Sequence, residues 1–329
     1  MKKIITGIIG YGVVGKRRHF FLEKNKKYSV KYISDVLFEK NYRKNDVHYF
    51  KKYLDLLNQQ DLDVVFITLP NYLAPIVTKQ ALKKKLHVFC EKPPAKNVRD
   101  LKSVINVEKK NKNLKLKYGF NHRYHGSVMK AKEVLNSKQL GKVINIRAIY
   151  GKSKIVTFNK NEWRAKKRYA GGGILLDQGI HLIDLILFFH GNFTKYKSFI
   201  SNKFWKYDVE DNAFSIMRDK KGVIASIHST ATQWEHKFSI EITCQYGMLI
   251  LSGILSSTKS YGKEQLIILK KLKNSVKKKY FTFKNDNSWR NEIKDFAKLI
   301  KNNNKVKIGS SLQALNAMEV IEKIYKSDN

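Results

Sequence analysis

The sequence predicts an α/β protein of two domains: a doubly wound parallel sheet, followed by an α+β domain with a large, mainly antiparallel sheet. From residue 3 to about residue 120, short apolar strands alternate with amphipathic helices, which is typical of a parallel sheet covered on both faces. After about residue 122 the strands become longer, and apolar and polar residues alternate as in a half-exposed sheet. A chain of 329 residues has room for two cores, so we expect domains at residues 1–121 and 122–329.

The first domain has five strand candidates separated by helical stretches. The strands are expected at Ile4–Ile9, Tyr28–Ser34, Val64–Thr68, His87–Cys90 and Leu116–Gly119. Apolar residues three or four apart predict helices over Ile76–Lys84 and Arg99–Asn111. All four prolines come shortly after the third and fourth strands, where the chain leaves the sheet. Doubly wound folds bind ligands at this edge.

The second domain is expected to start with a helix over Ser127–Ser137. Strands should follow at Lys142–Tyr150, Ala213–Arg218, Val223–Ala231, Lys237–Cys244, Met248–Leu251 and Gln265–Lys270. A hairpin turn is expected at Asp219-Lys220-Lys221-Gly222, and two helices, Trp289–Lys301 and Leu312–Tyr325, close the chain. Such a sheet needs cover for its second face, so we predict a homodimer or homotetramer assembled through it.

The basic composition is the most unusual global property of the chain. The formal net charge is +38, from 65 Lys and Arg against 27 Asp and Glu. The basic residues are spread over every segment, without a basic strip interleaved with aromatic residues. We therefore expect a solvated lysine-rich surface and no nucleic-acid partner. A positive field would still attract anionic ligands, including dinucleotides and sugar nucleotides.

The cellular compartment is inferred from cysteine content and apolar stretches. Cys90 and Cys244 are the two cysteines of the chain, which fits a reducing cytoplasm better than a disulfide framework. A strand, a tight turn and a helix explain the apolar start of the chain better than a signal peptide does. The apolar stretch Ile174–Phe189 contains three ionisable residues and falls short of the ~20 residues that span a bilayer. We predict a cytoplasmic protein without a membrane partner.

A glycine-rich turn joins the first predicted strand to a helix. It consists of Gly10-Tyr11-Gly12-Val13-Val14-Gly15, and this spacing lets a pyrophosphate approach the helix N-terminus closely. Asp35 lies twenty residues past Gly15, at the end of the second strand, where a carboxylate can accept hydrogen bonds from the adenosine ribose. The pattern predicts a Rossmann domain. Because Asp35 would repel a 2′-phosphate, we expect NAD rather than NADP.

A charged pair stands at the end of the fourth strand. Glu91 and Lys92 precede Pro93 at the ligand-binding edge of the sheet, where a lysine can donate a hydrogen bond to a substrate oxygen. The alternative is a surface ion pair between Glu91 and Lys92. The neighbouring Cys90 is expected to be an inert buried thiol.

The stretch that follows Gly171-Gly172-Gly173 contains a histidine between two carboxylates. In a regular helix Asp177, His181 and Asp184 would share one face. The ordinary pKa of imidazole lies near neutral pH, so His181 is a candidate general base whose tautomer a carboxylate could fix. The alternatives are a buried histidine paired for structural reasons and a metal ligand. Too few strong donors lie nearby for a metal, so we expect none.

In this order the motifs resemble the Gfo/Idh/MocA family, which includes glucose-fructose oxidoreductase and inositol dehydrogenase. The resemblance spans nearly the whole chain. It is carried by the glycine turn with Asp35, by Thr68-Leu69-Pro70-Asn71, Glu91-Lys92-Pro93, Gly119-Phe120-Asn121-His122-Arg123 and Trp163-Arg164, by the glycine triplet with Asp177, Gly179, His181 and Asp184, and by the helix from Trp289.

The resemblance implies an NAD-dependent dehydrogenase acting on a CH–OH group of a sugar, polyol or nucleotide sugar. It implies that Lys92 and His181 flank the reacting carbinol, with His181 as proton acceptor and Asp177 assisting. The implied cofactor contacts are the six residues of the glycine turn, Asp35, Leu69, Pro70, Asn71, Glu91 and Lys92. The implied substrate contacts are Lys92, Asn121, Arg123, Trp163, Arg164, Asp177 and His181.

Some assignments stay open at the level of the sequence. Many relatives have a histidine where this chain has Ala74, so the cofactor contacts of the loop around Asn71 are less secure than those of the glycine turn. Arg123, Trp163 and Arg164 are candidates by position and could equally pack between elements. The same fold could also serve an NAD-retaining lyase or glycosidase, or a non-catalytic NAD(H)-binding regulator.

Overall fold

The computed structural model describes residues 2–153, 159–256 and 261–328, and the chain divides into two compact units. The first unit comprises Met1–Phe120 and Trp289–Leu315, and the second comprises Asn121–Ser288 and Asn316–Asn329. The first division lies one residue from the predicted boundary between 121 and 122. The expected continuous domain at 122–329 does not match these units, because Trp289–Leu315 belong to the first of them.

The helix α8 (Ser288–Lys301) explains why the chain returns to the first unit. Its apolar residues Ile293 and Phe296 are fully buried in one cluster with Ile8, Phe66 and Phe89 of the first sheet. Burying two such side chains contributes several kcal/mol to stability. The segment that follows α8 is also tied to this unit, because the Tyr118 N–H donates to the Gly309 carbonyl oxygen at 2.7 Å.

Within the described residues, the first unit contains a seven-stranded sheet in the order β3-β4-β2-β1-β5-β6-β7. Its strands are β1 (Ile4–Ile9), β2 (Tyr28–Ser34), β3 (Tyr42–Lys44), β4 (Val47–Phe50), β5 (Val64–Ile67), β6 (His87–Glu91) and β7 (Leu116–Gly119). The β3–β4 pair is antiparallel, and the other neighbours are parallel. The strand order reverses at β1, which is where doubly wound sheets open a crevice for ligands.

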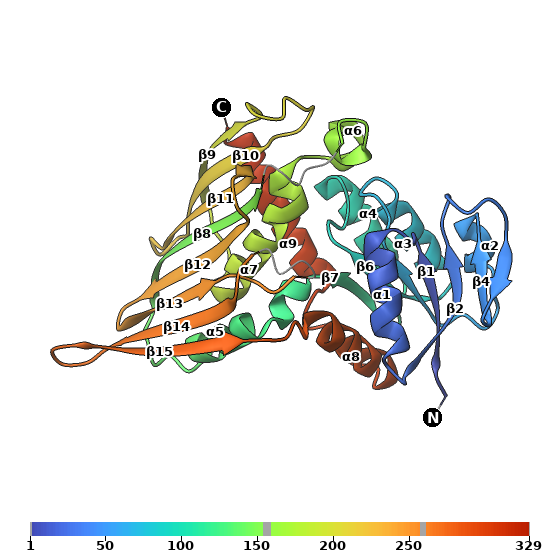
Figure 1. Cartoon of the computed structure of the whole chain (residues 1–329), viewed down its shortest axis with the longest axis horizontal. Helices are drawn as coiled ribbons and strands as arrows, with labels where there is room; N and C mark the ends of the chain where they lie inside the picture. Colours follow the sequence, from blue (N-terminus) through green and yellow to red (C-terminus); the bar gives the residue numbers. More distant parts are fainter. Residues whose placement is uncertain (1, 154–158, 257–260, 329) are drawn as a thin grey trace. The chain divides into compact units, whose positions relative to one another are not determined.

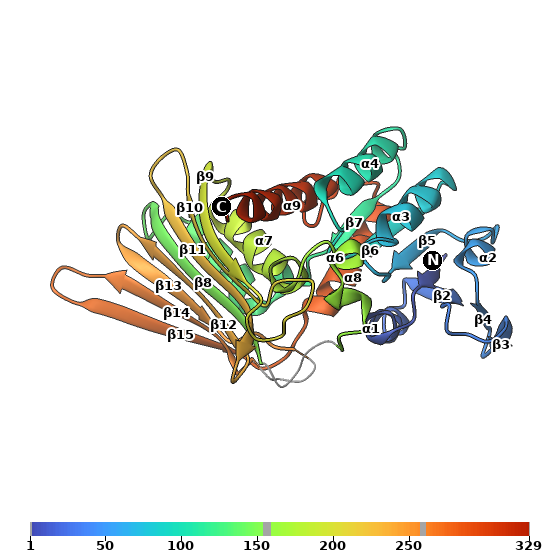
Figure 2. The same ribbon diagram turned by 90° about the horizontal axis from the view of Figure 1, so that it is seen from above.

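Helices cover both faces of this sheet, as the strongly apolar strands require. α1 (Val13–Glu23) and α8 lie on one face, and α3 (Ala74–Lys83) and α4 (Val98–Lys109) lie on the other (Figure 1, Figure 2). The short α2 (Tyr53–Leu57) follows β4. The predicted doubly wound domain is therefore confirmed.

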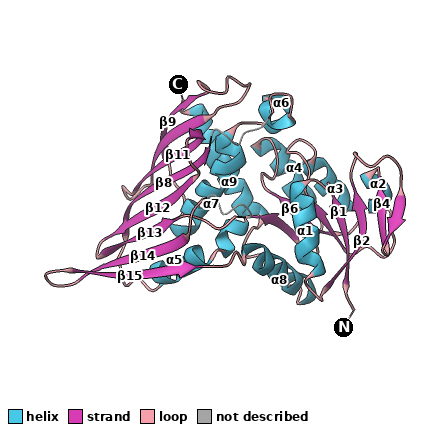
Figure 3. Cartoon of the chain, viewed as in Figure 1, coloured by secondary structure: helices cyan, strands magenta, loops and turns pink. Residues whose placement is uncertain are grey.

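The second unit contains an eight-stranded sheet in the order β15-β14-β13-β12-β8-β11-β10-β9, counted over the described residues (Figure 3). β8 and β11 pair in parallel and the other neighbours are antiparallel, which confirms the predicted mainly antiparallel sheet. The strands are β8 (Val143–Ser153), β9 (Lys195–Ser201), β10 (Asn212–Arg218), β11 (Ile224–Gln233), β12 (Lys237–Cys244), β13 (Gly247–Ser252), β14 (Glu264–Lys271) and β15 (Val276–Phe283).

One face of this sheet is covered by α5 (Gly126–Asn136), α7 (Ile180–Phe189) and α9 (Ser311–Lys326) (Figure 1). The connections include three short helices, η1 (Asn121–Tyr124), η2 (Trp163–Ala165) and α6 (Lys167–Ala170), and a π-helical turn, η3 (Leu175–Gly179). Along β10, buried and exposed residues alternate strictly, so the second face of the sheet carries exposed side chains.

One helical stretch, Lys167–Phe189, is long and apolar enough by composition to cross a membrane. However, 78% of its 18-residue window is buried inside the protein, as in the core helix of a globular domain. This agrees with the expectation that the apolar residues between 174 and 189 serve a core.

Candidate active site

The glycine turn of the first unit has a shape that suits a dinucleotide. Gly10 has a φ of +91°, and a Cβ there would meet the Thr68 carbonyl oxygen at 2.7 Å. A Cβ at Gly15 would collide with the Gly10 carbonyl oxygen, whereas a Cβ at Gly12 would meet nothing within 4 Å. The turn therefore needs glycine at two positions for its own packing and leaves open space at the third.

The N-terminus of α1 faces this turn without an anionic side chain of its own. Among the described residues no side chain caps the helix, and its first turn has no acidic residue. The first N–H groups of α1 and its positive dipole end are thus suited to a phosphate. These features fit the pyrophosphate of NAD.

Asp35 lies beside the same turn. Its Oδ2 accepts a hydrogen bond from the Tyr11 N–H at 2.5 Å, and its Oδ1 accepts one from the Leu37 N–H at 2.9 Å. A carboxylate has about four lone-pair sites, so these two bonds orient Asp35 and leave sites for the hydroxyls of a ribose. Val36 and Leu37 are 76% and 85% exposed and provide apolar surface next to it.

The loop after β5 is joined to the glycine turn by Thr68, which was named in a motif but not assigned to the site from the sequence. The Thr68 hydroxyl donates to the Gly10 carbonyl oxygen at 2.5 Å. Leu69 comes close to Gly10, since a Cβ there would meet its side chain at 3.1 Å, and Asn71 is buried. The structure thus brings this predicted cofactor loop together with the glycine turn.

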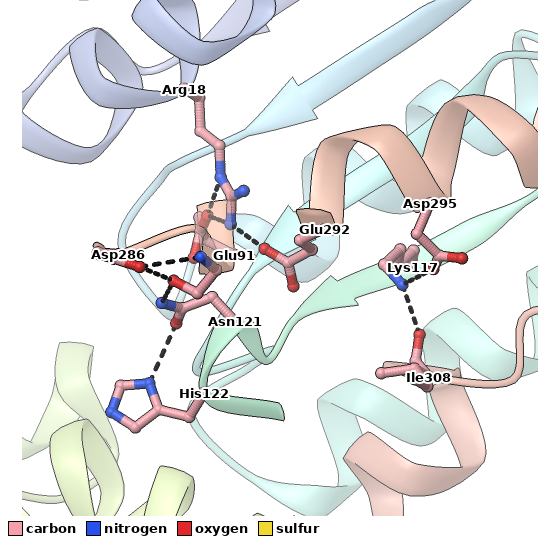
Figure 4. Close-up of polar contacts among 10 residues, drawn as sticks. Arg18, Glu91, Lys117, Asn121, His122, Asp286, Glu292, Asp295 and Ile308 are labelled. Atoms are coloured by element: carbon pink, nitrogen blue, oxygen red, sulfur yellow. Dashed lines mark hydrogen bonds and ion pairs between the residues drawn. The ribbon is translucent and has the colours of Figure 1, made fainter. Parts of the chain in front are cut away.

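Glu91, one of the predicted cofactor contacts, is engaged by a buried arginine. Arg18 Nε donates to its Oε1 at 2.6 Å, and Arg18 also donates to Glu292 Oε2 at 2.7 Å (Figure 4). The Arg18 side chain is completely buried, with its guanidinium 4.3 Å from the centre of the Phe89 ring. This network anchors the end of β6, so Glu91 fixes the backbone immediately before the half-buried Lys92. Glu91 thus forms an ion pair with buried Arg18, a partner that the sequence did not suggest.

The network could not be found from sequence spacing. Arg18 and Glu292 are 274 residues apart. Lys117 of β7 is a second buried cation, and it connects the first sheet to α8 and to the segment after it. It donates to Asp295 Oδ2 at 2.8 Å and to the Ile308 carbonyl oxygen at 2.7 Å (Figure 4).

Because of Glu292, the stability of the first unit is predicted to depend on pH. Burial raises the pKa of Glu292 from 4.5 to about 7, although Arg18 and Lys117 act in the opposite direction. Because the folded state holds this proton more tightly, the associated stability is fully present below pH 4.5 and is lost as the pH rises through about 7. We expect Glu292→Gln to abolish up to about 3 kcal/mol of this decline, measured by urea unfolding between pH 5 and 8.

Asp46→Asn is the control for this experiment, because it alters an exposed carboxylate of the same unit that is paired with the exposed Arg43. It should leave the pH dependence of the unfolding free energy close to that of the wild type. An identical pH dependence in the wild type and in Glu292→Gln would contradict the assignment to Glu292.

In the second unit, a π-helical turn departs from the regular helix expected between Asp177 and Asp184. η3 contains Asp177 and runs directly into α7, which carries His181. π-helical turns occur frequently at functional sites because they change the direction of the side chains that follow. The buried carboxylate of Glu210 accepts from the Gly173 N–H at 2.7 Å and the Leu175 N–H at 3.0 Å, which fixes the start of this segment.

Asp184 does not serve His181 as a neighbouring carboxylate. It is buried and forms a bidentate pair with Arg123, whose Nε and Nη2 donate at 2.7 and 2.6 Å. Burial raises the pKa of Asp184, and Arg123 opposes this effect. The pair joins η1 to α7, so the contacts of Arg123 support the packing alternative.

His181 is 4% exposed and stacks on His122 of η1, with ring centres 3.7 Å apart and planes at 14°. His122 Nε2 lies 3.1 Å from the Tyr150 hydroxyl, and its Nδ1 lies 3.2 Å from Asn121 Oδ1. Burial, and next Tyr261, raise the pKa of Tyr150 well above 10, so this phenol keeps its proton. Neither His122, which was named in a motif, nor Tyr150 was assigned to the site from the sequence, because η1 and β8 meet α7 only in the folded chain.

Further polar residues surround this pair of rings. The Tyr261 hydroxyl donates to Gln178 Oε1 at 3.2 Å, one residue after the half-buried Asp177. His125 lies 2.8 Å from Glu264 in a buried pair. Burial acts to raise the pKa of Glu264, but hydrogen bonds from His125 and Ser127 together with the charge of His125 hold it below its usual range. The described part of the second unit thus collects imidazole, phenol and carboxylate groups around His181.

The remaining predicted residues occupy other positions. Trp163 and Arg164 are half-buried in η2, with the guanidinium 4.5 Å from the indole ring centre. Burial raises the pKa of Cys90 to about 12, which keeps this thiol protonated and agrees with an inert role. Among the described residues, no group of three or more His, Cys, Asp or Glu side chains is arranged to hold a metal ion.

Comparison with known proteins identifies both parts of the chain. Residues 4–120 match the NAD-binding Rossmann fold of the Gfo/Idh/MocA oxidoreductases, and residues 128–250 match the C-terminal domain of the same family. Together the two models cover more than half of the chain. The predicted family and its NAD-binding Rossmann domain are confirmed.

Individual relatives are more distant. An uncharacterised oxidoreductase of Bacillus subtilis (YrbE) is 25% identical over 238 residues, which cover 70% of this chain and 67% of the relative. Levoglucosan dehydrogenase of Pseudarthrobacter phenanthrenivorans is 25% identical over 201 residues, which cover 53% of this chain and about half (51%) of the relative. A levoglucosan dehydrogenase structure with NADH and L-sorbose has the same fold, with a TM-score of 0.85, 19% identity and coverage of 99% and 97%. The chain therefore belongs to the Gfo/Idh/MocA family of NAD-binding oxidoreductases.

Proposed function

We propose that this protein transfers a hydride between NAD and a CH–OH group of a sugar, polyol or nucleotide sugar. The observation that carries the proposal is the buried, stacked His181 in a cluster of polar groups, in a chain whose first unit has an open glycine turn beside Asp35. The names of relatives support the substrate class, since levoglucosan dehydrogenase acts on a sugar derivative and one of its structures holds L-sorbose.

In this proposal His181 accepts the hydroxyl proton during oxidation, and Lys92 and Asp177 orient the substrate oxygen. Bound NAD supplies the hydride acceptor at its nicotinamide ring. The glycine turn, Asp35 and Leu69 to Asn71 would hold the cofactor, whereas Glu91, held by Arg18, fixes the backbone next to Lys92. Of the predicted substrate contacts, Trp163 and Arg164 remain candidates, and Asn121 and Arg123 act by positioning their neighbours.

Cofactor binding gives the direct test of the first unit. We expect NADH to bind more tightly than NADPH, because Asp35 would lie next to a 2′-phosphate, and we expect Asp35→Ala to weaken NADH binding about tenfold. Calorimetric titration at high salt suppresses nonspecific attraction to the +38 surface. Asp46→Ala, which removes an exposed carboxylate paired with Arg43, is the matched control. Saturable binding of neither nucleotide would overturn the assignment of the site.

Turnover separates the proposal from its two alternatives. Reduction of added NAD by a panel of sugars, polyols and nucleotide sugars supports the dehydrogenase. Release of product with tightly retained NAD, without net reduction of added cofactor, would favour a lyase or glycosidase. Tight NAD binding without any chemistry would favour a regulator.

We also propose that copies of this chain associate through the open face of the second sheet. Phe199, Phe214 and Ile216 on β9 and β10 are 82%, 51% and 56% exposed, which is unusual for adjacent large apolar side chains on a monomer surface. Light scattering should report a dimer or tetramer, and Phe199→Lys with Ile216→Lys should lower the mass to that of one chain. A wild-type mass equal to one chain would contradict the prediction.

A further inference from the structure

The stacked ring of His122 is held in one protonation state by a chain of hydrogen bonds that ends at a carboxylate. Asp286 Oδ1 can only accept, so the Ser288 hydroxyl donates to it at 2.6 Å. The Asn121 amide then donates to Ser288 Oγ at 3.2 Å, which turns its carbonyl oxygen towards His122 Nδ1. Figure 4 shows the Asn121 end of this chain. Nδ1 of His122 therefore carries the hydrogen.

The other nitrogen of the ring is engaged by Tyr150. Tyr150 keeps its proton because its pKa is raised well above 10, first by burial and then by Tyr261. The Tyr150 hydroxyl lies 3.1 Å from His122 Nε2 and also forms a hydrogen bond with Tyr261, and we assign its single hydrogen to His122 Nε2. With Nδ1 donating and Nε2 accepting, His122 is the neutral tautomer, and the broad face of its ring lies against His181 at 3.7 Å.

We propose that His122 is a positioning residue for the base, which orients His181 and stabilises the imidazolium that forms when His181 accepts the substrate proton. This inference rests on the proposed function, in which the substrate O–H bond breaks and an N–H bond forms on His181. A cation over a neutral π face is attracted more strongly where water is excluded, and both rings are buried. The stabilisation is absent before proton transfer, so it lowers the barrier rather than only strengthening substrate binding.

Other groups around the two rings are also engaged in interactions of their own. His125, whose ring centre lies 5.5 Å from that of His122, is paired with Glu264, and Arg123 is paired with Asp184. Titratable and charged groups near the stack come from η1, the N-cap of α5, η3, α7, β8, β14 and the segment before β14. They are Arg123, His125, Asp177, Asp184, Tyr150, Glu264 and Tyr261.

The test compares His122→Phe with His122→Leu. Both variants lose the hydrogen bonds to Asn121 and Tyr150, but Phe keeps a π face against His181 and Leu does not. We expect kcat to stay within about threefold of the wild type in the Phe variant and to fall about tenfold in the Leu variant. The titration midpoint of His181, followed by NMR of its ring without substrate, should lie about one pH unit lower in Leu than in Phe. The acid limb of the kcat profile should shift in the same direction.

The experiment distinguishes a failure of the inference on His122 from a failure of the proposed function. If the wild type turns over no sugar, the proposed function fails, while the NMR midpoints still test the stack. Equal midpoints in the Phe and Leu variants would overturn the inference, as would equal losses of kcat in both. His122→Met supplies a second aliphatic variant should Leu prevent folding. His190→Leu, at the end of α7 beside Asp219, controls for loss of a histidine and should leave kcat unchanged.

Discussion

Replacement of His181 by Ala is expected to lower kcat by about 100-fold or more while NADH binding is retained. General bases contribute about 10² to 10⁴ to the rate, and the proposed mechanism assigns the proton transfer to this side chain. The glycine turn and Asp35 belong to the first compact unit and His181 to the second, so cofactor affinity should not depend on the imidazole. Stopped-flow or steady-state turnover and calorimetric titration of NADH measure the two properties separately.

The design needs controls for folding and for the residue type. His190→Ala removes the histidine that caps the C-terminus of the same helix and should leave kcat close to that of the wild type. Lys92→Ala should also lower kcat about 100-fold, because the proposal places both side chains on the reacting oxygen. Near-normal turnover in His181→Ala and Lys92→Ala would remove both from the mechanism. A wild type that binds NADH without turning over any substrate of the panel would instead favour the regulator.

Much of the fold could be predicted because local patterns and packing agree. β1, β2, β7 and β12 begin and end at the predicted residues, since each is an apolar or alternating run bounded by turn residues. The β3–β4 hairpin was not predicted, although its two turn residues are of types that favour hairpin turns. Asn45 and Asp46 both have positive φ, as a two-residue hairpin turn requires.

Other elements carry no clear local signal. β15 was missed because three consecutive lysines, Lys277, Lys278 and Lys279, occupy both of its faces and hide the alternation. Lysines on an edge strand are a known protection against pairing with other chains, so their presence has a physical reason. The return of α8 to the first unit is a long-range packing effect, which hydrophobic periodicity alone does not reveal.

The part of the candidate site that could be predicted from the sequence is the part whose residues are brought together by neighbouring elements of the chain. The glycine turn and Asp35 are adjacent in space because a strand, a turn and a strand bring them there, and their spacing in the sequence reflects this. The partners of Glu91, Asp184 and His181 come from distant segments, so their pairing could not be read from the sequence. Asp184 illustrates the difference, since its expected role beside His181 is taken by its pair with Arg123.

Removal of Arg18 is expected to have the largest effect on stability. Arg18→Met keeps an apolar stem against Phe89 and Trp289 but leaves Glu91 and Glu292 without their shared cation. Breaking a buried ion pair by removing one partner costs about 3 to 5 kcal/mol, because a buried charge is left uncompensated. Urea unfolding of the variant should therefore show a lower midpoint with an unchanged slope.

Two further measurements identify the cause of this loss. If uncompensated charge is responsible, Arg18→Met should recover part of its stability as the pH falls, since protonation of Glu292 removes a buried charge. The double variant Arg18→Met with Glu292→Gln should likewise be more stable than Arg18→Met at pH 8. If the double variant is as unstable as the single one at every pH, the loss comes from packing against the two aromatic rings. In that case the network would anchor β6 through the shape of Arg18 rather than through its charge.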